Sequence, residues 1–120
     1  MLPPLTHTHT LLYAHAVVPY INRTRITFLH VYKPGETIRM DCPAYGIPAP
    51  DIVWSSHTLN RSVSDVINSS RLHFFPNGSL EISELMAGDE ALYSCAAINS
   101  VGTDTVYILV INELAYKFCK

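Results

Sequence analysis

The stretch "GDEALYSCAA", residues 88–97, places a tyrosine two positions before a cysteine in an alternating pattern. Side chains of a β-strand repeat with period two, so Tyr93 and Cys95 lie on the same face of any strand that contains them. Ala91 and Ala97 share that face, whereas Leu92 and its alternate neighbours lie on the other. The pattern therefore predicts a strand that buries a phenol and a thiol side by side.

The length and composition of the chain restrict what it can be. Its 120 residues fit one domain, and 48% of them are apolar, which is enough for a packed core. Only 15% are charged and the net charge is −2, with no basic block. Nucleic-acid binding depends on clustered lysine and arginine, so it is disfavoured.

Short alternating segments separated by turn residues predict an all-β fold, either a sandwich or a barrel. Seven such segments are expected as strands, at residues 25–32, 37–42, 51–56, 71–75, 79–85, 91–97 and 105–111. An α+β fold would require a helix within residues 62–70. That segment, "SVSDVINSS", is rich in serine and β-branched residues and is a poor helix former.

The cysteine count limits the possible chemistry. The chain has three cysteines, Cys42, Cys95 and Cys119, and no C-x-x-C pair. Zinc ribbons and thioredoxin-type redox motifs therefore find no support. At most one internal disulfide can form, and one thiol is left over.

A set of motifs resembles the immunoglobulin I-set domain. Cys42 falls on an early predicted strand, Trp54 on the next and Cys95 on the penultimate one. Four stretches match the family pattern: "GIPAPDIVW" (46–54), "PNGSLEI" (76–82), "DEALYSC" (89–95) and "AAINSVG" (96–102). The resemblance covers about residues 17–112, and the motifs are specific in combination although each is weak alone.

The resemblance implies an immunoglobulin-like Greek-key β-sandwich of two packed antiparallel sheets. In that fold Cys42 and Cys95 form a disulfide between the sheets and Trp54 packs against it. Tyr93 becomes the tyrosine whose hydroxyl bonds to backbone at the turn before its strand. Closing a loop of about fifty residues contributes roughly 4 kcal/mol to stability in the chain-entropy treatment.

Three further residues have expected structural roles. Leu80 belongs to the predicted core, because it alternates with Ile82 against Glu81. By resemblance, Asp89 is a buried acid paired with Arg71 at the start of the strand near residue 72. The alternative is that Asp89 is simply a solvated turn residue.

Four N-x-[ST] sequons predict N-glycosylation in the secretory pathway, at Asn22, Asn60, Asn68 and Asn77. Asn60 and Asn68 are the better candidates, since the region they occupy is exposed in this fold. Asn77 also has a structural interpretation, because an Asn-Gly pair favours a tight hairpin turn with positive φ.

The predicted organisation is a single module within a longer chain. Residues 1–16 are expected to be a low-complexity leader that does not fold, residues 17–113 the domain, and residues 114–120 a tail. It is left open whether Met1 is the true start. Cys119 in the tail could pair with a neighbouring domain, pair with another molecule, or belong to an unrelated segment.

No catalytic site is expected. His57 follows Ser55 and Ser56, with Asp51 and Asp65 nearby in sequence, but nothing resembles G-x-S-x-G or a comparable signature. The His7-x-His9 pair is explained by low complexity rather than by a metal. The chain is thus predicted to be a non-enzyme with no cofactor, metal, small-molecule substrate or membrane span.

Two functions fit the resemblance. The first is an extracellular protein-recognition module, homophilic or heterophilic, like those of hemicentin-like and peroxidasin-like matrix proteins, matrix-remodelling proteins and neural cell-adhesion proteins. Its candidate surfaces are the last strand with Tyr107 and the region that contains Asn60 and Asn68. The second is an intracellular structural or docking module of the titin type, with its thiols free. The sequons and the cysteine pair favour the first.

Overall fold

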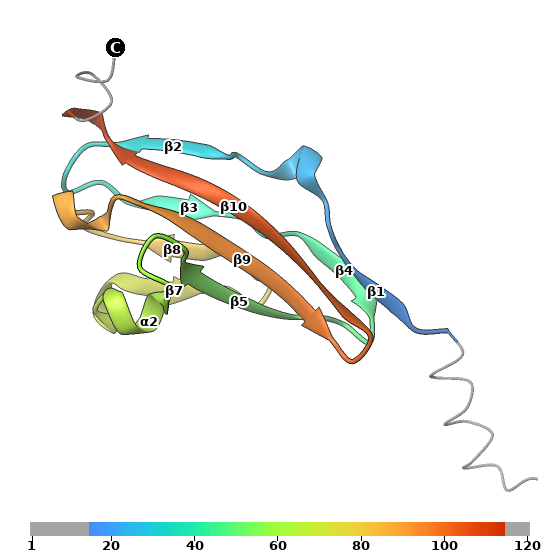
Figure 1. Cartoon of the computed structure of the whole chain (residues 1–120). Helices are drawn as coiled ribbons and strands as arrows, with labels where there is room; N and C mark the ends of the chain where they lie inside the picture. Colours follow the sequence, from blue (N-terminus) through green and yellow to red (C-terminus); the bar gives the residue numbers. More distant parts are fainter. Residues whose placement is uncertain (1–14, 115–120) are drawn as a thin grey trace, which may run out of the picture.

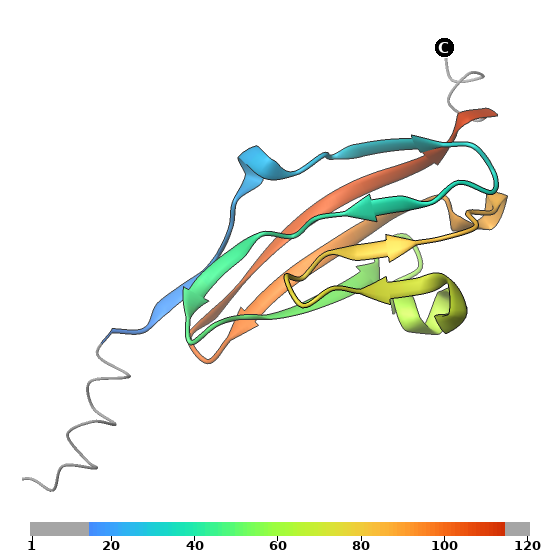
Figure 2. The same cartoon turned by 180° about the vertical axis from the view of Figure 1, so that it is seen from behind.

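Two β-sheets packed face to face form the body of the protein (Figures 1 and 2). The computed structural model describes residues 15–114. The larger sheet has the strand order β2-β10-β9-β5-β6. Its strands are β2 (Leu29–Tyr32), β10 (Gly102–Asn112), β9 (Ala91–Asn99), β5 (Asp51–Ser56) and β6 (Arg61–Ser62).

The smaller sheet has the order β3-β8-β7 and covers the inner face of the larger one. Its strands are β3 (Ile38–Met40), β8 (Leu80–Ile82) and β7 (Leu72–Phe74). A separate two-stranded ribbon lies at one end of the sandwich, where β1 (Val17–Ile21) pairs antiparallel with β4 (Ala44–Ile47).

The central strand β9 shows why these residues form this sheet. Tyr93, Cys95 and Ala97 are buried, and the residues between them are not. Cys95 pairs with Trp54 of β5 on one side and with Val106 of β10 on the other. All three side chains are buried, so the period-two pattern of each strand directs its apolar residues to the same interior.

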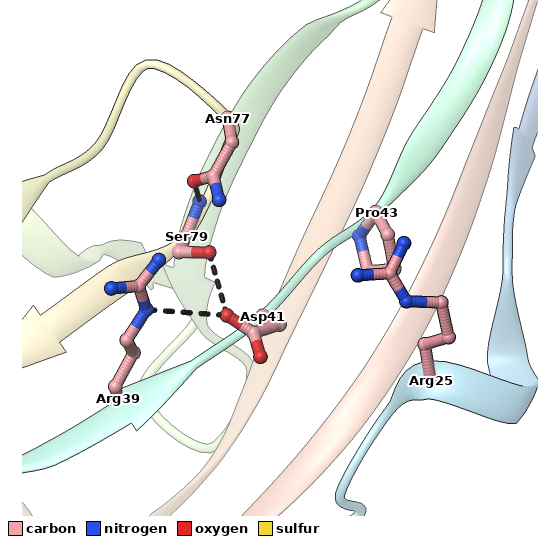
Figure 3. Close-up of a pocket in the computed structure, with 6 residues that line it drawn as sticks. All are labelled: Arg25, Arg39, Asp41, Pro43, Asn77 and Ser79. Carbon is pink, nitrogen blue, oxygen red and sulfur yellow. Dashed lines mark hydrogen bonds and ion pairs between the residues drawn. The ribbon is translucent and has the colours of Figure 1, made fainter.

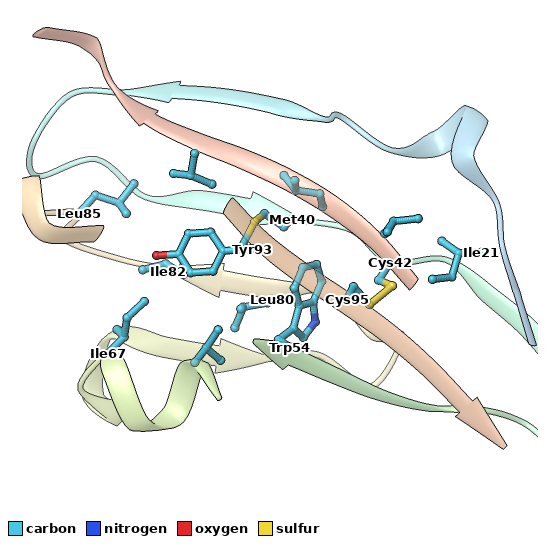
Figure 4. Close-up of a cluster of buried hydrophobic side chains, with 14 of the residues drawn as sticks. Ile21, Met40, Cys42, Trp54, Ile67, Leu80, Ile82, Leu85, Tyr93 and Cys95 are labelled. Carbon is cyan, nitrogen blue, oxygen red and sulfur yellow. A yellow bond between two sulfur atoms is a disulfide. The ribbon is translucent and has the colours of Figure 1, made fainter. Parts of the chain in front are cut away.

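The core is closed by the disulfide between Cys42 and Cys95, whose Cα atoms lie 6.5 Å apart (Figure 4). Trp54 packs beside it, and its indole nitrogen donates a hydrogen bond to the carbonyl of Gly78 at 2.9 Å. Met40 and Leu80 contribute fully buried side chains from the smaller sheet. These contacts join the two layers at their centre.

The all-β immunoglobulin-like sandwich expected from the sequence is confirmed, with two local differences. β2 runs parallel to its neighbour β10, so the larger sheet is not wholly antiparallel. A single helical turn, α2 (Val63–Val66), lies in the segment judged a poor helix former. The side chain of Ser62 caps this turn by accepting from the Ser64 N–H, and Val63 is buried against the core. Capping and tertiary packing thus override weak propensity.

The predicted strand at residues 25–32 is too long at its beginning. A 3₁₀ turn, η1 (Arg23–Arg25), precedes β2, and the strand itself begins only at Leu29. The side chain of Asn22 caps η1 by accepting from the Thr24 N–H. Two more 3₁₀ turns precede β7 and β9, namely η2 (Ser69–Arg71) and η3 (Ala87–Asp89).

The helical segments between residues 15 and 114 are all short. None of them has the length and apolar content needed to cross a lipid bilayer.

Candidate functional site

The outer face of the larger sheet carries almost no charge. We call it the uncharged sheet face and define it by the outward side chains of β2, β5, β9 and β10. They alternate with buried residues and are exposed or half-buried. The set is Leu29, Val31, Val53, Ser55, Leu92, Ser94, Ala96, Ile98, Thr103, Thr105, Tyr107, Leu109 and Ile111. The one charged side chain at an outward position of these strands is Asp51, at the beginning of β5.

Tyr107 is the largest side chain on this face. Its register neighbour on β9 is Ser94, which in turn pairs with Ser55 of β5. Because both neighbours are small, the ring stands above the sheet, and 47% of Tyr107 is exposed. The His57 ring packs against it edge-on, with centroids 4.9 Å apart. The face thus presents one aromatic side chain surrounded by small and aliphatic ones.

The outer face of the smaller sheet is different in character. Arg39 of β3 pairs in register with Glu81 of β8, which pairs with His73 of β7. The guanidinium of Arg39 lies 4.1 Å from the centroid of the Phe75 ring and 3.3 Å from a carboxylate oxygen of Asp41. The two faces of the sandwich therefore offer a partner an uncharged surface and a charged one.

Two adjoining hollows lie between the β1–β4 ribbon and the smaller sheet. The first, of about 290 Å³, is shown in Figure 3 and contains the Arg39–Asp41 pair and the hydroxyl of Ser79. Ser79 donates to Asp41 at 2.7 Å. The second, of about 330 Å³, is lined by Tyr20, Asn22, Arg25, Pro43, Ala44, Tyr45 and Asn77.

Arg71 and Asp89, predicted as a pair, form a two-pronged ion pair in the structure. The nitrogen–oxygen distances are 2.7 and 3.1 Å, and the side chains are only 11% and 7% exposed. Asp89 also accepts the Met86 N–H at 2.8 Å. The Asp89 carboxylate raises the pKa of Arg71 above its ordinary value, chiefly through these hydrogen bonds. This arrangement holds a turn together and has no open access for a ligand.

Two buried tyrosines complete the same corner. The hydroxyl of Tyr93 donates to the carbonyl of Asp89, and that of Tyr32 donates to the carbonyl of Met86. Burial raises the pKa of Tyr93 and raises the pKa of Tyr32 to about 12. Both phenols are therefore neutral donors at physiological pH, and their role is structural.

The four sequons lie at surface positions. Asn60 and Asn68 are exposed, in the turn after β5 and at the beginning of η2, and Asn77 is exposed in the β7–β8 turn. In this turn the positive φ belongs to Gly78, at 93°. Asn22 is half-buried beside the ribbon. Whether any sequon carries a glycan stays a prediction.

The residues weighed for catalysis do not come together. Ser56 is buried and its hydroxyl accepts the Leu59 N–H, while His57 contacts Tyr107. Within residues 15–114, no group of three or more His, Cys, Asp or Glu side chains is placed to hold a metal ion. His7, His9 and Cys119 lie outside the described residues.

Sequence reasoning singled out Tyr107 but missed the surface around it. Val53, Ala96 and Leu109 join Tyr107 only because three strands align in register. A signal was present, since the outward positions of the predicted strands at residues 91–97 and 105–111 lack charge. The neighbouring order of the strands was needed to see one surface.

Comparison with known proteins supports the fold and its family. The immunoglobulin I-set domain family matches residues 24–111. Neural cell adhesion molecule L1.1 of Danio rerio is 42% identical over 80 residues, which is 67% of this chain and 6% of that protein. Matrix-remodeling-associated protein 5 of Homo sapiens is 34% identical over 72 residues, which is 60% of this chain and 2% of that protein. The chain thus spans only a small part of these relatives.

Solved structures show the same architecture. Extracellular domains 3–5 of Drosophila OTK match with a TM-score of 0.71 and 27% identity, over 80% of this chain and 31% of that one. Titin domain M7 matches with a TM-score of 0.68 over 81% of this chain and 95% of that one. Its identity is 18%, so this likeness concerns the fold alone.

Proposed function

Because the chain belongs to the immunoglobulin I-set domain family, we propose that it is an extracellular protein-recognition module of a cell-adhesion or matrix protein. The module spans residues 17–113, with residues 1–16 and 114–120 outside it. Fold alone does not assign a ligand, so the proposal rests on the surface.

The observation that carries it is the uncharged sheet face. An exposed face of aliphatic and small polar side chains around one tyrosine has the composition of a protein-interface core, which is depleted in charge and enriched in tyrosine. A protein partner can cover it without burying an unpaired charge, which would oppose binding. The charged outer face of the smaller sheet lacks this property.

The extracellular compartment is supported by the Cys42–Cys95 pair and the four sequons. Disulfides persist in oxidising compartments and are rare in the cytosol. Relatives named as neural cell adhesion molecules agree with this location.

Mass spectrometry of the chain produced in mammalian cells tests the compartment. We expect secreted protein that loses mass on glycosidase treatment and contains the Cys42–Cys95 disulfide before reduction. Unmodified asparagines together with three free thiols would overturn the extracellular proposal and favour the intracellular structural alternative.

Sedimentation of the purified protein over a range of concentrations tests whether the uncharged sheet face binds a protein. The partner in this experiment is a second copy of the chain. We expect weak self-association that Tyr107→Asp abolishes. Tyr45→Asp is the matched control, because Tyr45 is equally a strand tyrosine but lies on the ribbon. Self-association lost equally in both variants would exclude the uncharged sheet face as its cause. Secreted protein that stays monomeric would restrict the partner to a different protein.

A further inference from the structure

We propose that an N-linked glycan on Asn22 places its first sugar in the hollow between Tyr20 and Tyr45. The inference rests on the proposed function, because it requires passage through the secretory pathway. It assigns both a modification site and the surface that receives the modification.

The sequon is part of the wall of the hollow. Asn22 lies two residues after Tyr20 in extended conformation, with φ −75° and ψ 96°, and Ile21 between them is fully buried. Tyr20 and Asn22 therefore project to the same outer side. Both line the second hollow, of about 330 Å³, which is large enough for a monosaccharide unit.

The second tyrosine comes from the neighbouring strand. Tyr45 of β4 is the register partner of Tyr20 of β1, and the two are 61% and 56% exposed. Two large aromatic side chains paired on a two-stranded ribbon are costly to leave in water. A pyranose ring has a face of C–H groups that packs on an aromatic ring, so a sugar at this place would cover both.

The hollow also has a polar side chain that can bind the oxygen atoms of a sugar. The side chain of Arg25 lines it and has no hydrogen-bond or ion-pair partner among residues 15–114. Its guanidinium offers up to five donors to sugar oxygens. One wall thus supplies apolar faces and the other supplies donors, which is what the two sides of a sugar ring require.

The geometry of Asn22 leaves its amide nitrogen available. The side-chain oxygen accepts from the N–H of Thr24 at 3.2 Å and from its hydroxyl at 2.6 Å. The nitrogen, which is the atom that carries the sugar, has no hydrogen-bond partner within the described part of the chain. A glycan can therefore be attached without breaking a contact of the fold.

Asn77 is the competing origin, because it lines the same hollow. Asn22 is favoured since it follows Tyr20 by two residues and projects to the same side of the chain, whereas the serine of the other sequon, Ser79, is buried and bonded to Asp41. A glycan attached at Asn77 would need to cross the hollow to reach the tyrosine pair.

Glycopeptide mass spectrometry and thermal unfolding of the secreted chain test the proposal. We expect Asn22 to be occupied. In chain secreted by cells that add only high-mannose glycans, complete removal with PNGase F is expected to lower Tm by on the order of 4 °C. PNGase F also converts each glycosylated asparagine to aspartate, so the tyrosine variants below, which undergo the same conversion, are the control for the added charge. Endo H leaves the first N-acetylglucosamine in place, so it is expected to leave Tm almost unchanged.

Tyrosine variants isolate this site from the other sequons. In Tyr45→Ala, glycan removal should lower stability less than in the wild type, because one of the two rings on which the sugar packs is already absent. Tyr107 is an exposed tyrosine on the larger sheet, away from the hollow. In Tyr107→Ala, glycan removal should therefore lower stability as much as it does in the wild type. Nuclear Overhauser contacts between N-acetylglucosamine and tyrosine ring protons in the wild type give a second measurement that needs no variant.

The failures can be distinguished. If Asn60 or Asn68 is glycosylated and Asn22 is not, the present inference is overturned and the extracellular proposal stands. If no sequon is used but the Cys42–Cys95 disulfide is present, the present inference alone is overturned; unused sequons together with free thiols overturn both proposals. The placement on Asn22 would also be overturned if glycan removal lowered the stability of Tyr45→Ala and Tyr107→Ala equally. Contacts between the tyrosine rings and a sugar on Asn77 would overturn it as well.

Discussion

Arg71 and Asp89 show how a single pair of charges is fixed by its surroundings. The carboxylate accepts from two guanidinium nitrogens and from the Met86 N–H. One of these nitrogens, Nη1 of Arg71, also donates to the carbonyls of Ser83 and Glu84 at 3.4 and 3.3 Å. The two charges therefore fasten the turn before β9 to the segment before β7.

Asp89→Asn should lower the free energy of unfolding by about 3 kcal/mol, because it leaves the Arg71 cation largely buried without its counter-ion. Urea denaturation measures the change, and Asp51→Asn, an exposed change at the beginning of β5, is the control. A loss for Asp89→Asn below about 1 kcal/mol, the value of an exposed ion pair, would contradict the structural role.

Tyr93→Phe removes one hydroxyl and leaves the carbonyl of Asp89 without its donor. An unmade buried hydrogen bond costs about 1–3 kcal/mol, so a loss in that range is expected. Tyr107→Phe is the matched control, since Tyr107 is half-exposed and we expect almost no change there. The two variants are compared by their chemical denaturation midpoints. Similar midpoints would show that the Tyr93 hydroxyl contributes nothing.

At the scale of elements, two turns place a glycine at positive φ but differ in their surroundings. Gly35 has φ 91° and no atom within 4 Å of an added Cβ. Gly78 has φ 93°, and an added Cβ would lie 2.9 Å from Ile52 and 3.2 Å from the carbonyl of Cys42. Gly35→Ala should therefore cost about 1–2 kcal/mol from backbone strain alone.

Gly78→Ala should cost clearly more than Gly35→Ala, because it adds a clash with Ile52 of β5 and with the carbonyl of Cys42. Thermal unfolding of the two alanine variants, measured side by side, checks the order. A Gly78→Ala variant as stable as Gly35→Ala would mean that the β7–β8 turn can move away from the core without cost.

The attachment of β1 to β10 has its own pH dependence. Asp104 accepts from Arg23 at 2.8 and 2.9 Å and from the Ile21 N–H at 2.8 Å. The hydrogen bonds from Arg23 are the main cause that lowers the pKa of Asp104 from 3.8 to about 2. A carboxyl group with a depressed pKa in the folded state stabilises it above its unfolded pKa, and this stability is lost as the pH falls.

The wild type should therefore be more stable than Asp104→Asn above about pH 4, and the difference should shrink as the pH approaches 2. Because Arg23 is 44% exposed, the difference is expected to stay below about 1 kcal/mol. Thermal unfolding across this pH range, with Asp51→Asn as the control, measures it. A gap that stays constant down to pH 2 would contradict the assignment.

Some elements could be predicted from local pattern and others could not. The strand at residues 51–56 coincides with β5, since its apolar residues alternate and Trp54 marks the inward face. β4 was missed because "AYGI" has no strong pattern, and its pairing with β1 comes from a distant segment. The helical turn α2 was missed because its cap and its buried Val63, not its propensity, decide its conformation. For the same reason Tyr107 could be proposed alone, while the face around it needed the strand order.

At the scale of the whole molecule, the sandwich separates its tasks. The core is filled by the disulfide, Trp54 and the buried residues of the smaller sheet. The two outer faces of the sandwich differ in charge. The ribbon of β1 and β4 lies at one end of the sandwich (Figure 1), and the hollow that it lines adjoins the smaller sheet rather than the uncharged sheet face. A partner on the uncharged sheet face and a glycan on the ribbon would therefore not compete for the same surface.

The stability of the whole domain should depend on the oxidation state of one bond. Cys42 and Cys95 are separated by 53 positions, so the disulfide restricts a long loop of the unfolded chain. In the chain-entropy treatment, a loop of this length corresponds to roughly 4 kcal/mol, a large share of the 5–15 kcal/mol typical of a folded domain. Urea denaturation with and without reductant measures the difference.

We expect the reduced protein to unfold at a much lower urea concentration, because the hydrophobic core alone must then offset the full chain entropy. Refolding after reoxidation, with the Cys42–Cys95 bond verified by peptide mapping, controls for damage by the reductant. Equal unfolding midpoints for the two forms would mean that the core is sufficient without the bond. In that case a reducing compartment would be compatible with the fold, and the location of the module would have to be argued from its glycans alone.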